Sequence, residues 1–324
     1  MFVRVAVAEP RRRPMSSAHW PESVDEIIGG DQAVMLATVT PARGVVLTPV
    51  TNFGARDRGA GTVTVNSSVG GWKKLERIRR DPRVALAFHT RLHGYSDRPE
   101  YVLVQGTASL SAPRDDYPAS LGADWERFDG PRATGPFWGP WLRPYYTRVV
   151  IDIAVERLIV WPDLSCKGNP EVFGPPLPGP PPPQKAPGLG TGPRIDHVKA
   201  ASRLESLPDA LLGWTGTDGF PVVVPVGFSG QDAGGILLHV PLGVLPDGGR
   251  RAGLTAHSFS KFVQGQHQRV HTGWLESGPQ VRYAPHTELA YRTPPSKLLY
   301  RLGIGVAMRV ALRRARSAGH DIAQ

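Results

Sequence analysis

Short runs of apolar and β-branched residues, separated by turn residues, fill positions 34–110 of the chain. They are VMLATVT at 34–40, VVLTPVTNF at 45–53, GTVTVN at 61–66, RVALAFHT at 83–90 and VLVQGTASL at 102–110. Each run has the length and composition of a β-strand, and a Pro-Ala-Arg-Gly turn separates the first two. Strands this short, with glycine in the turns and few helices between them, are typical of a closed β architecture.

Two short helices are predicted among these strands. Residues 24–30 follow Ser23, which suits an N-cap, and Glu26 stands at the capping-box position. Residues 72–81 (WKKLERIRRD) form the second helix, which is strongly basic. It ends at the Asp81-Pro82 pair, because a residue that precedes proline disfavours the helical conformation.

The chain ends in a predicted amphipathic helix. Five apolar residues recur there at helical spacing with arginines between them: Leu298, Leu299, Leu302, Val306 and Val310. We expect this helix to pack on its own barrel or on a partner subunit. A helix that lies on a membrane surface is the alternative.

The second half of the chain repeats the order of these patterns. A helix is predicted at 202–207, and two strands follow in ALLGWTGTDGFPVVVPVGF, whose turn contains the hairpin signal Asp218-Gly219. GILLHVPLGVL then parallels GTVTVNSSVGG, RAGLTAHSF parallels RVALAFHT, and RVHTGWLES parallels YVLVQGTASL. Correspondences in one order predict an internal duplication, in which each half is a small barrel of about six strands.

A stretch rich in proline and glycine separates the halves. It contains GNPEVFGPPLPGPPPPQKAPGLGTGPR, and its four consecutive prolines favour an extended polyproline conformation. We therefore predict a first domain at 20–165, a linker at 166–195 and a second domain at 196–324. A proline-rich partner motif is the alternative interpretation of the linker.

Composition and cysteine usage narrow the class of protein. The 324 residues are 40% hydrophobic and 20% charged, which suits about two ordinary globular domains. No apolar run is long enough for a membrane-spanning helix, and the N-terminal residues lack the order of a secretory signal. The single cysteine, Cys166, excludes an intrachain disulfide and a thiolate metal cluster. We expect a cytoplasmic protein without stable membrane insertion.

The net charge of +10 raises the question of an anionic partner. Arginines cluster at 11–13, 77–83, 250–251 and 309–316. A solvated basic surface is the simplest interpretation. Because no nucleic-acid module accompanies the charge, we expect no nucleic-acid partner and favour a phosphorylated small ligand instead.

The strand at 61–66 and the basic helix after it form the corner where such a ligand is expected. Asn66 and Ser67 end the strand, and a Gly-Gly pair at 70–71 permits close approach of a ligand to the backbone. Lys73 and Lys74 lie in the first helical turn, where lysine opposes the helix dipole unless an anion is near. This corner is therefore predicted to bind phosphate.

The order of these residues resembles the pyridoxamine 5'-phosphate oxidase-like split-barrel family, which includes flavin- and deazaflavin-dependent oxidoreductases. The resemblance rests on LATVT-x-x-x-G-x-x-x-TPV at 36–50, on Lys74-x-x-Arg77-Ile-Arg-Arg-Asp-Pro-Arg-Val-Ala-Leu and on VLVQGTASL at 102–110. It implies a split β-barrel, usually paired as a dimer with cofactors bound at the interface. A cytoplasmic oxidoreductase that binds FMN or F420 and acts on a small molecule is the function it implies.

The resemblance also implies a set of cofactor-binding residues. Lys74 with Arg77 matches the phosphate-gripping helix, and Asn66 and Ser67 match the strand end beside the phosphate. Thr48, Pro49 and Val50 match the strand that lies along the cofactor ring, Gln105 falls on the strand that commonly faces the ring, and Trp72 completes the set. Trp72 stands where family members often carry a serine or threonine, so it either stacks on a ring or belongs to the core.

The second half departs further from the family pattern. Only PDGG at 246–249 stands where the basic helix stood in the first half. We therefore expect a degenerate second barrel that replaces the partner subunit, giving a pseudo-dimer in one chain with one site at the seam. An ordinary homodimer is the alternative.

The sequence also leaves other cofactors and other functions as alternatives. Five histidines gather in the second half, so a non-catalytic haem-binding or flavin-binding barrel is the alternative function, and a barrel without a cofactor is a third. His267 and His271 share a strand face, but no acidic residue completes a zinc motif, and we predict no metal site. No catalytic residue is identified. His89, Tyr95, Tyr101 and Tyr145 are undistinguished candidates for a proton donor.

Overall fold

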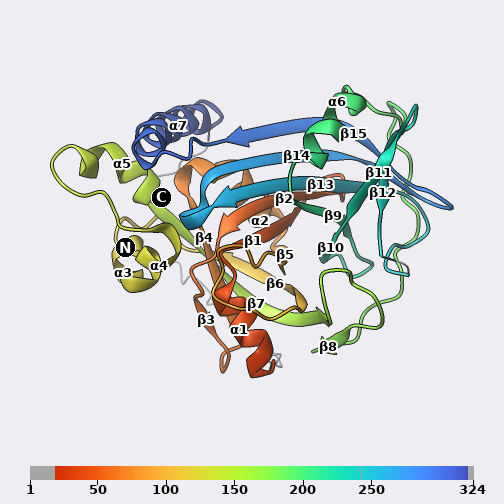
Figure 1. The fold of residues 1–324 in the computed structure, drawn as a ribbon, viewed down its shortest axis with the longest axis horizontal. Helices are drawn as coiled ribbons and strands as arrows, with labels where there is room; N and C mark the ends of the chain where they lie inside the picture. The colour runs from red at the N-terminus through yellow and green to blue at the C-terminus, as the bar shows by residue number, and fades with distance from the viewer. Residues whose placement is uncertain (1–18, 242, 320–324) are drawn as a thin grey trace, which may run out of the picture.

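The computed structural model describes residues 19–241 and 243–319. The N-terminal segment, with the arginines at 11–13 and the expected absence of a secretory signal, lies outside the described residues. The described chain forms two β-sheets, one in each half, that pack against each other with helices at the margins (Figure 1).

The first half forms the larger sheet. Its strands are β1 (Ala33–Val39), β2 (Val45–Thr51), β3 (Arg56–Asp57), β4 (Thr62–Ser68), β5 (Arg83–Phe88), β6 (Tyr101–Leu110), β7 (Arg148–Trp161) and β8 (Glu171–Phe173). They are ordered β2-β1-β5-β6-β7-β4-β3, and β8 also pairs with β7. The helices are α1 (Glu22–Gly30), the 3-10 turn η1 (Val69–Gly71), α2 (Trp72–Arg80), α3 (Tyr117–Leu121), α4 (Ala123–Asp129) and α5 (Trp138–Tyr146).

The second half forms a sheet of the same kind. Its strands are β9 (Asp209–Thr215), β10 (Pro221–Pro225), β11 (Gly227–Asp232), β12 (Gly235–His239), β13 (Gly248–Ser260), β14 (Gln264–Ser277) and β15 (Val281–Arg292). They are ordered β10-β9-β13-β14-β15-β12-β11. The helices are α6 (His197–Glu205), the 3-10 turn η2 (Lys261–Val263) and α7 (Lys297–Ser317).

The two sheets have the same strand order: adding eight to each strand number in the order of the first sheet gives the order of the second. A β-bulge even recurs at the same place, between Gln105 and Gly106 in one half and between Thr272 and Gly273 in the other. The prediction of a mainly β chain with two tandem split β-barrels and a C-terminal helix is therefore confirmed.

Apolar side chains from both halves close the seam between the sheets. One buried cluster joins Met35 and Leu47 of the first half to Leu211 and Val223 of the second. Gly253 of β13 lies so close to β2 that a Cβ there would overlap the carbonyl oxygen of Val45. The halves therefore share a core, as two subunits of a tight dimer would.

The segment predicted as a linker is docked on both sheets. Its strand β8 pairs with β7 of the first sheet. Further along, the backbone N–H of Gln184 donates to the Gly249 carbonyl at 2.8 Å, and the Arg250 guanidinium donates to the Pro181 carbonyl at 3.3 Å. The proline-rich stretch thus has fixed partners. Among the described residues, no helix combines the length and apolarity that crossing a bilayer requires.

Candidate functional site

A cavity of about 250 Å³ opens at the end of β4, where η1 and α2 begin. Its first-half wall comes from β2, β4, α2 and β7, which contribute Thr48, Pro49, Val50, Asn66, Ser67, Lys74 and Arg148. The second half closes it with Gln266 and Gln268 of β14, Tyr291 of β15 and Tyr300 of α7. The cavity therefore lies between the two halves.

Lys74 is the central cation of this cavity. It is partly buried, and no acidic side chain of the described chain lies within ion-pair distance of its ammonium group. Burial, together with the charges of Arg77 and Arg148, lowers its pKa to about 7. A buried cation surrounded by other cations is stabilised by an anionic ligand.

Two further hydrogen-bond donors in this cavity also favour an anionic ligand. Arg148 is buried, its guanidinium lies over the rings of Tyr145 (4.3 Å) and Trp125 (5.0 Å), and its Nε has no hydrogen-bond partner. The Nδ2 of the buried Asn66 has no partner at normal hydrogen-bond geometry, although this side chain also interacts with the Tyr117 hydroxyl. Unpaired buried donors are costly unless a ligand or water accepts from them.

The start of α2 leaves room for a ligand beside these donors. Gly71 caps the helix without a side-chain hydrogen bond, and the first turn carries no acidic residue. A Cβ at Gly71 would overlap the hydroxyl of Ser67 and lie 3.5 Å from the Lys74 side chain. Glycine therefore keeps open the space between these two groups, at the positive end of a helix dipole.

An acid and two phenols form the other side of the cavity. The Tyr145 hydroxyl donates to Asp129 Oδ1 at 3.1 Å, and Tyr300 is hydrogen-bonded to Tyr145. Burial raises the pKa of the Asp129 carboxyl to about 6, although Arg148 opposes the shift. Burial also raises the pKa of both phenols, so each keeps its proton near neutral pH.

Six of the nine residues chosen from the sequence line this cavity: Thr48, Pro49, Val50, Asn66, Ser67 and Lys74. The other three lie elsewhere. Arg77 donates from Nε to the Thr38 hydroxyl at 3.0 Å. Gln105 donates to the Pro221 carbonyl at 2.9 Å and lines a different cavity. Trp72 opens α2 with the Lys73 ammonium 5.5 Å from its ring centre.

Sequence reasoning missed the residues that come from distant segments. Arg148, Asp129 and Tyr300 lie outside the three motifs that carry the family resemblance. The available signal was compositional: aromatic residues crowd the helical stretch 137–146, which neither barrel repeat requires. Of the four candidate proton donors, Tyr145 alone is among the residues that line the cavity.

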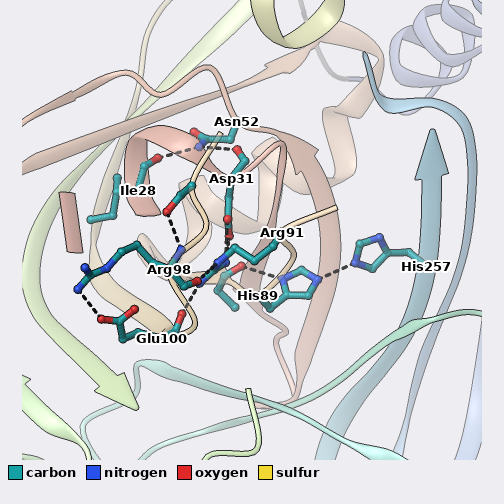
Figure 2. Close-up of polar contacts among 10 residues, drawn as sticks. Ile28, Asp31, Asn52, His89, Arg91, Arg98, Glu100 and His257 are labelled. Atoms are coloured by element: carbon teal, nitrogen blue, oxygen red, sulfur yellow. Dashed lines mark hydrogen bonds and ion pairs between the residues drawn. The ribbon is translucent and has the colours of Figure 1, made fainter. Parts of the chain in front are cut away.

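The seam also brings together two histidines at equivalent positions of the repeat. His89 and His257 are each buried, and their Nε2 atoms lie 2.7 Å apart (Figure 2). His89 Nδ1 donates to the Ala87 carbonyl at 3.0 Å, so its Nε2 accepts from the protonated Nε2 of His257. Burial lowers the pKa of His89 to about 4 and that of His257 well below its usual range.

A polar network lies next to this histidine pair, on the side of the first half (Figure 2). Arg91 donates to both carboxylate oxygens of the buried Asp31 at 2.7 Å, and the Asn52 amide donates to the Asp31 and Ile28 carbonyls. The network ties the end of β5 to α1 and β2. Its contacts are internal, and neither histidine is among the residues that line the cavity at Lys74.

No protein-family model matches the chain, and no curated protein matches it. Similar solved structures each cover less than half of it. A conserved hypothetical protein from Mycobacterium tuberculosis, Rv2991, is 20% identical over 46% of this chain and 89% of its own, with a TM-score of 0.33.

Two other similar structures carry functional names. An F420 reductase is 20% identical over 41% of this chain and 94% of its own, with a TM-score of 0.31. A putative pyridoxamine 5'-phosphate oxidase from Listeria innocua is 20% identical over 44% of this chain and 98% of its own, with a TM-score of 0.32. The solved structures that the chain is similar to thus include proteins named for the group that its sequence resembles.

Proposed function

We propose that this chain binds a phosphate-bearing flavin-type cofactor, FMN or F420, in the cavity at Lys74 and acts as an oxidoreductase on a small molecule. The observation that carries the proposal is the concentration of donors there. Lys74, Arg148 and Asn66 line one cavity, and neither of the two cations has an acidic partner within ion-pair distance in the described chain. A phosphate group would accept from all three.

The rest of the cavity suits the ring of such a cofactor. Thr48, Pro49 and Val50 of β2 form one wall, and the second half supplies Gln268 and Tyr291 opposite. In this proposal the second half takes the place of a partner subunit, so that one chain forms a pseudo-dimer with one cofactor site. The two domains predicted at 20–165 and 196–324 would meet at that site.

The cofactor, when bound, supplies the hydride or electron chemistry. The chain supplies binding, orientation and a proton. Tyr300, Tyr145 and Asp129 form a hydrogen-bonded series that ends on a carboxyl whose pKa is about 6. A group with a pKa near neutrality holds and releases a proton readily, so we assign Asp129 as the proton reservoir and Tyr145 as its link to the cavity.

The test is direct titration of the purified chain with FMN and with F420. Lys74→Ala removes one charge-assisted contact worth about 1.5–3 kcal/mol, which corresponds to about a 10- to 150-fold loss of affinity. Lys73→Ala is the matched control, because Lys73 lies in the same helical turn but is exposed and does not line the cavity. Equal affinities of the wild type and Lys74→Ala for both cofactors would remove the proposal.

A second variant separates binding from turnover. Asp129→Asn keeps the shape of the side chain but cannot hold a mobile proton, so cofactor affinity is expected to change less than about threefold. Oxidation of the reduced cofactor by a quinone acceptor is expected to slow at least tenfold and to lose its dependence on a group with a pKa near 6. A wild-type chain that binds cofactor but never turns over would establish the non-catalytic alternative instead.

A further inference from the structure

Helix α7 presents an apolar row to the outside of the molecule. Leu298, Leu299, Leu302, Val306 and Val310 are 57%, 55%, 38%, 52% and 40% exposed. From Leu299 onward they recur every three or four residues, and Leu298 flanks the first of them, so they form one row about 16–18 Å long on one helix face. Such a continuous apolar row on the surface marks an interaction site more often than scattered single residues do.

The opposite face of α7 packs against α5, so the helix is held on the protein by a face other than the exposed apolar row. Ile304 and Gly305 are buried, and a Cβ at Gly305 would overlap the Trp141 indole of α5. Trp141 donates to the Arg301 carbonyl at 3.1 Å, and Arg309 donates to the Trp141 carbonyl at 2.8 Å. Figure 1 shows α7 beside α5 at the margin of the molecule.

The charge of α7 identifies the kind of partner. The helix contains no acidic residue, and its basic residues are Lys297, Arg301, Arg309, Arg313, Arg314 and Arg316. Arg313, Arg314 and Arg316 are exposed, and none of them has an ion pair with another described residue. Arg313 continues the apolar row, three residues beyond Val310.

Among candidate partners, an anionic lipid surface complements both properties. A parallel second copy of α7 would bring the two sets of unpaired arginines together, and an antiparallel copy would place each set beside Lys297 and Arg301 of the other helix. Because α7 contains no acidic residue, neither arrangement pairs these charges. Lipid headgroups supply negative charge, and the underlying acyl region accepts leucine and valine side chains. We propose that α7 lies flat on an anionic membrane surface, with Leu299, Leu302, Val306 and Val310 in the headgroup boundary and Arg313 and Arg314 on lipid phosphates.

The experiment is co-sedimentation of the full chain with phosphatidylcholine vesicles that contain or lack phosphatidylglycerol. We expect at least tenfold tighter binding to the anionic vesicles, weakened by added salt. The triple variant Leu302→Ser, Val306→Ser, Val310→Ser is expected to lose at least tenfold in binding. The matched control is Leu189→Ser with Val198→Ser, since those side chains are 84% and 51% exposed elsewhere on the molecule.

Further measurements make the outcome decisive. Circular dichroism and cofactor titration of the triple variant show whether α7 still folds and the cavity is intact. Arg313→Glu with Arg314→Glu is expected to abolish the preference for phosphatidylglycerol while the apolar row is unchanged. Equal sedimentation with both vesicle types, or none with either, overturns the proposal. So does a wild-type dimer in light scattering that the triple variant converts to monomer.

Discussion

The cavity at Lys74 and its counterpart in the second half differ in chemistry, although they occupy equivalent places in the repeat. Matching strand registers pairs four polar lining residues of the strands with their counterparts: Thr48 with Val224, Asn66 with His239, Ser67 with Val240 and Arg148 with Gly278. The counterpart cavity, of about 920 Å³, is lined by Pro225, Val226, His239, Val240 and Gly278 among others. The equivalent positions of the second half thus have neither the hydroxyl groups nor the guanidinium group of the first cavity.

The comparison distinguishes the features that determine the fold from the features that form the site. Strand order and bulge position are the same in both halves, because they determine which faces are buried. Helices α2, α4, α5 and α7 each contribute residues to the first cavity, whereas in the second half the PDGG segment stands where the chain enters β13, which begins at its two glycines. The proposed activity therefore depends on these additions to the repeat, which the second cavity lacks.

The largest expected effect tests what the halves share. A Cβ at Gly106 would overlap the Ala154 carbonyl oxygen, and one at Gly273 would overlap the carbonyl oxygen of Ala284, its counterpart. Because the obstacle is backbone in both cases, Gly106→Ala and Gly273→Ala are each expected to destabilise the protein by about 3 kcal/mol. Urea unfolding measures both.

The control for this pair is Gly139→Ala, since no atom lies within 4 Å of a Cβ built there. It is expected to be neutral or stabilising, because alanine favours a helix over glycine. A large loss for Gly106→Ala beside a negligible one for Gly273→Ala would show that the second bulge has become tolerant, and would break the structural equivalence of the halves.

The next effect concerns the place where the halves meet. His89 has a pKa of about 4 in the folded chain, against an ordinary value of about 6.5. The unfolded chain therefore binds more protons between these values, so stability is complete above pH 6.5 and falls as the pH drops toward 4. The loss is on the order of 3 kcal/mol, measured by urea unfolding at a series of pH values.

Replacing both imidazoles separates this effect from general acid sensitivity. His89→Phe with His257→Phe is expected to reduce the loss of stability between pH 6.5 and 4, while His271, whose pKa burial also lowers to about 4, keeps its own share. His239→Ala should leave it unchanged, because His239 is exposed. If the double variant keeps the wild-type pH dependence, other groups carry it and the histidine pair has no part in holding the halves together under acid conditions.

A smaller effect belongs to the first cavity alone. The pKa of Lys74 is about 7, so the lysine loses its charge as the pH rises through neutrality. Anion binding favours the protonated form, and affinity for FMN or F420 is therefore expected to fall about tenfold between pH 7 and 9. Lys74→Arg, which stays charged, should keep its affinity over this range. An unchanged affinity of the wild type from pH 7 to 9 would show that Lys74 does not contact the ligand.

The sequence predicted the fold that the two halves share better than it predicted the residues that line the cavity at Lys74. Strand patterns and their repeated order predicted the tandem barrels, because runs of apolar and β-branched residues between turn residues indicate strands even where both faces are buried, as in β1. Lys74, Asn66 and Ser67 lie within one continuous strand-to-helix segment, so local order was enough to place them together. Arg148, Asp129 and Tyr300 reach the cavity from segments far apart in sequence, through the pairing of β7 with β4 and the placement of α4 and α7.

The smallest expected effect is the most informative about the second cavity. His239→Asn with Val240→Ser restores two polar side chains of the first cavity, yet we expect one bound cofactor per chain, as in the wild type. Two neutral groups replace neither the cation of Lys74 nor that of Arg148, and charge-assisted contacts are roughly twice as strong as neutral ones. Equilibrium dialysis counts the bound cofactor. Two cofactors on the wild type would mean that the second half binds phosphate by other residues, and two on the variant alone would mean that the neutral contacts suffice.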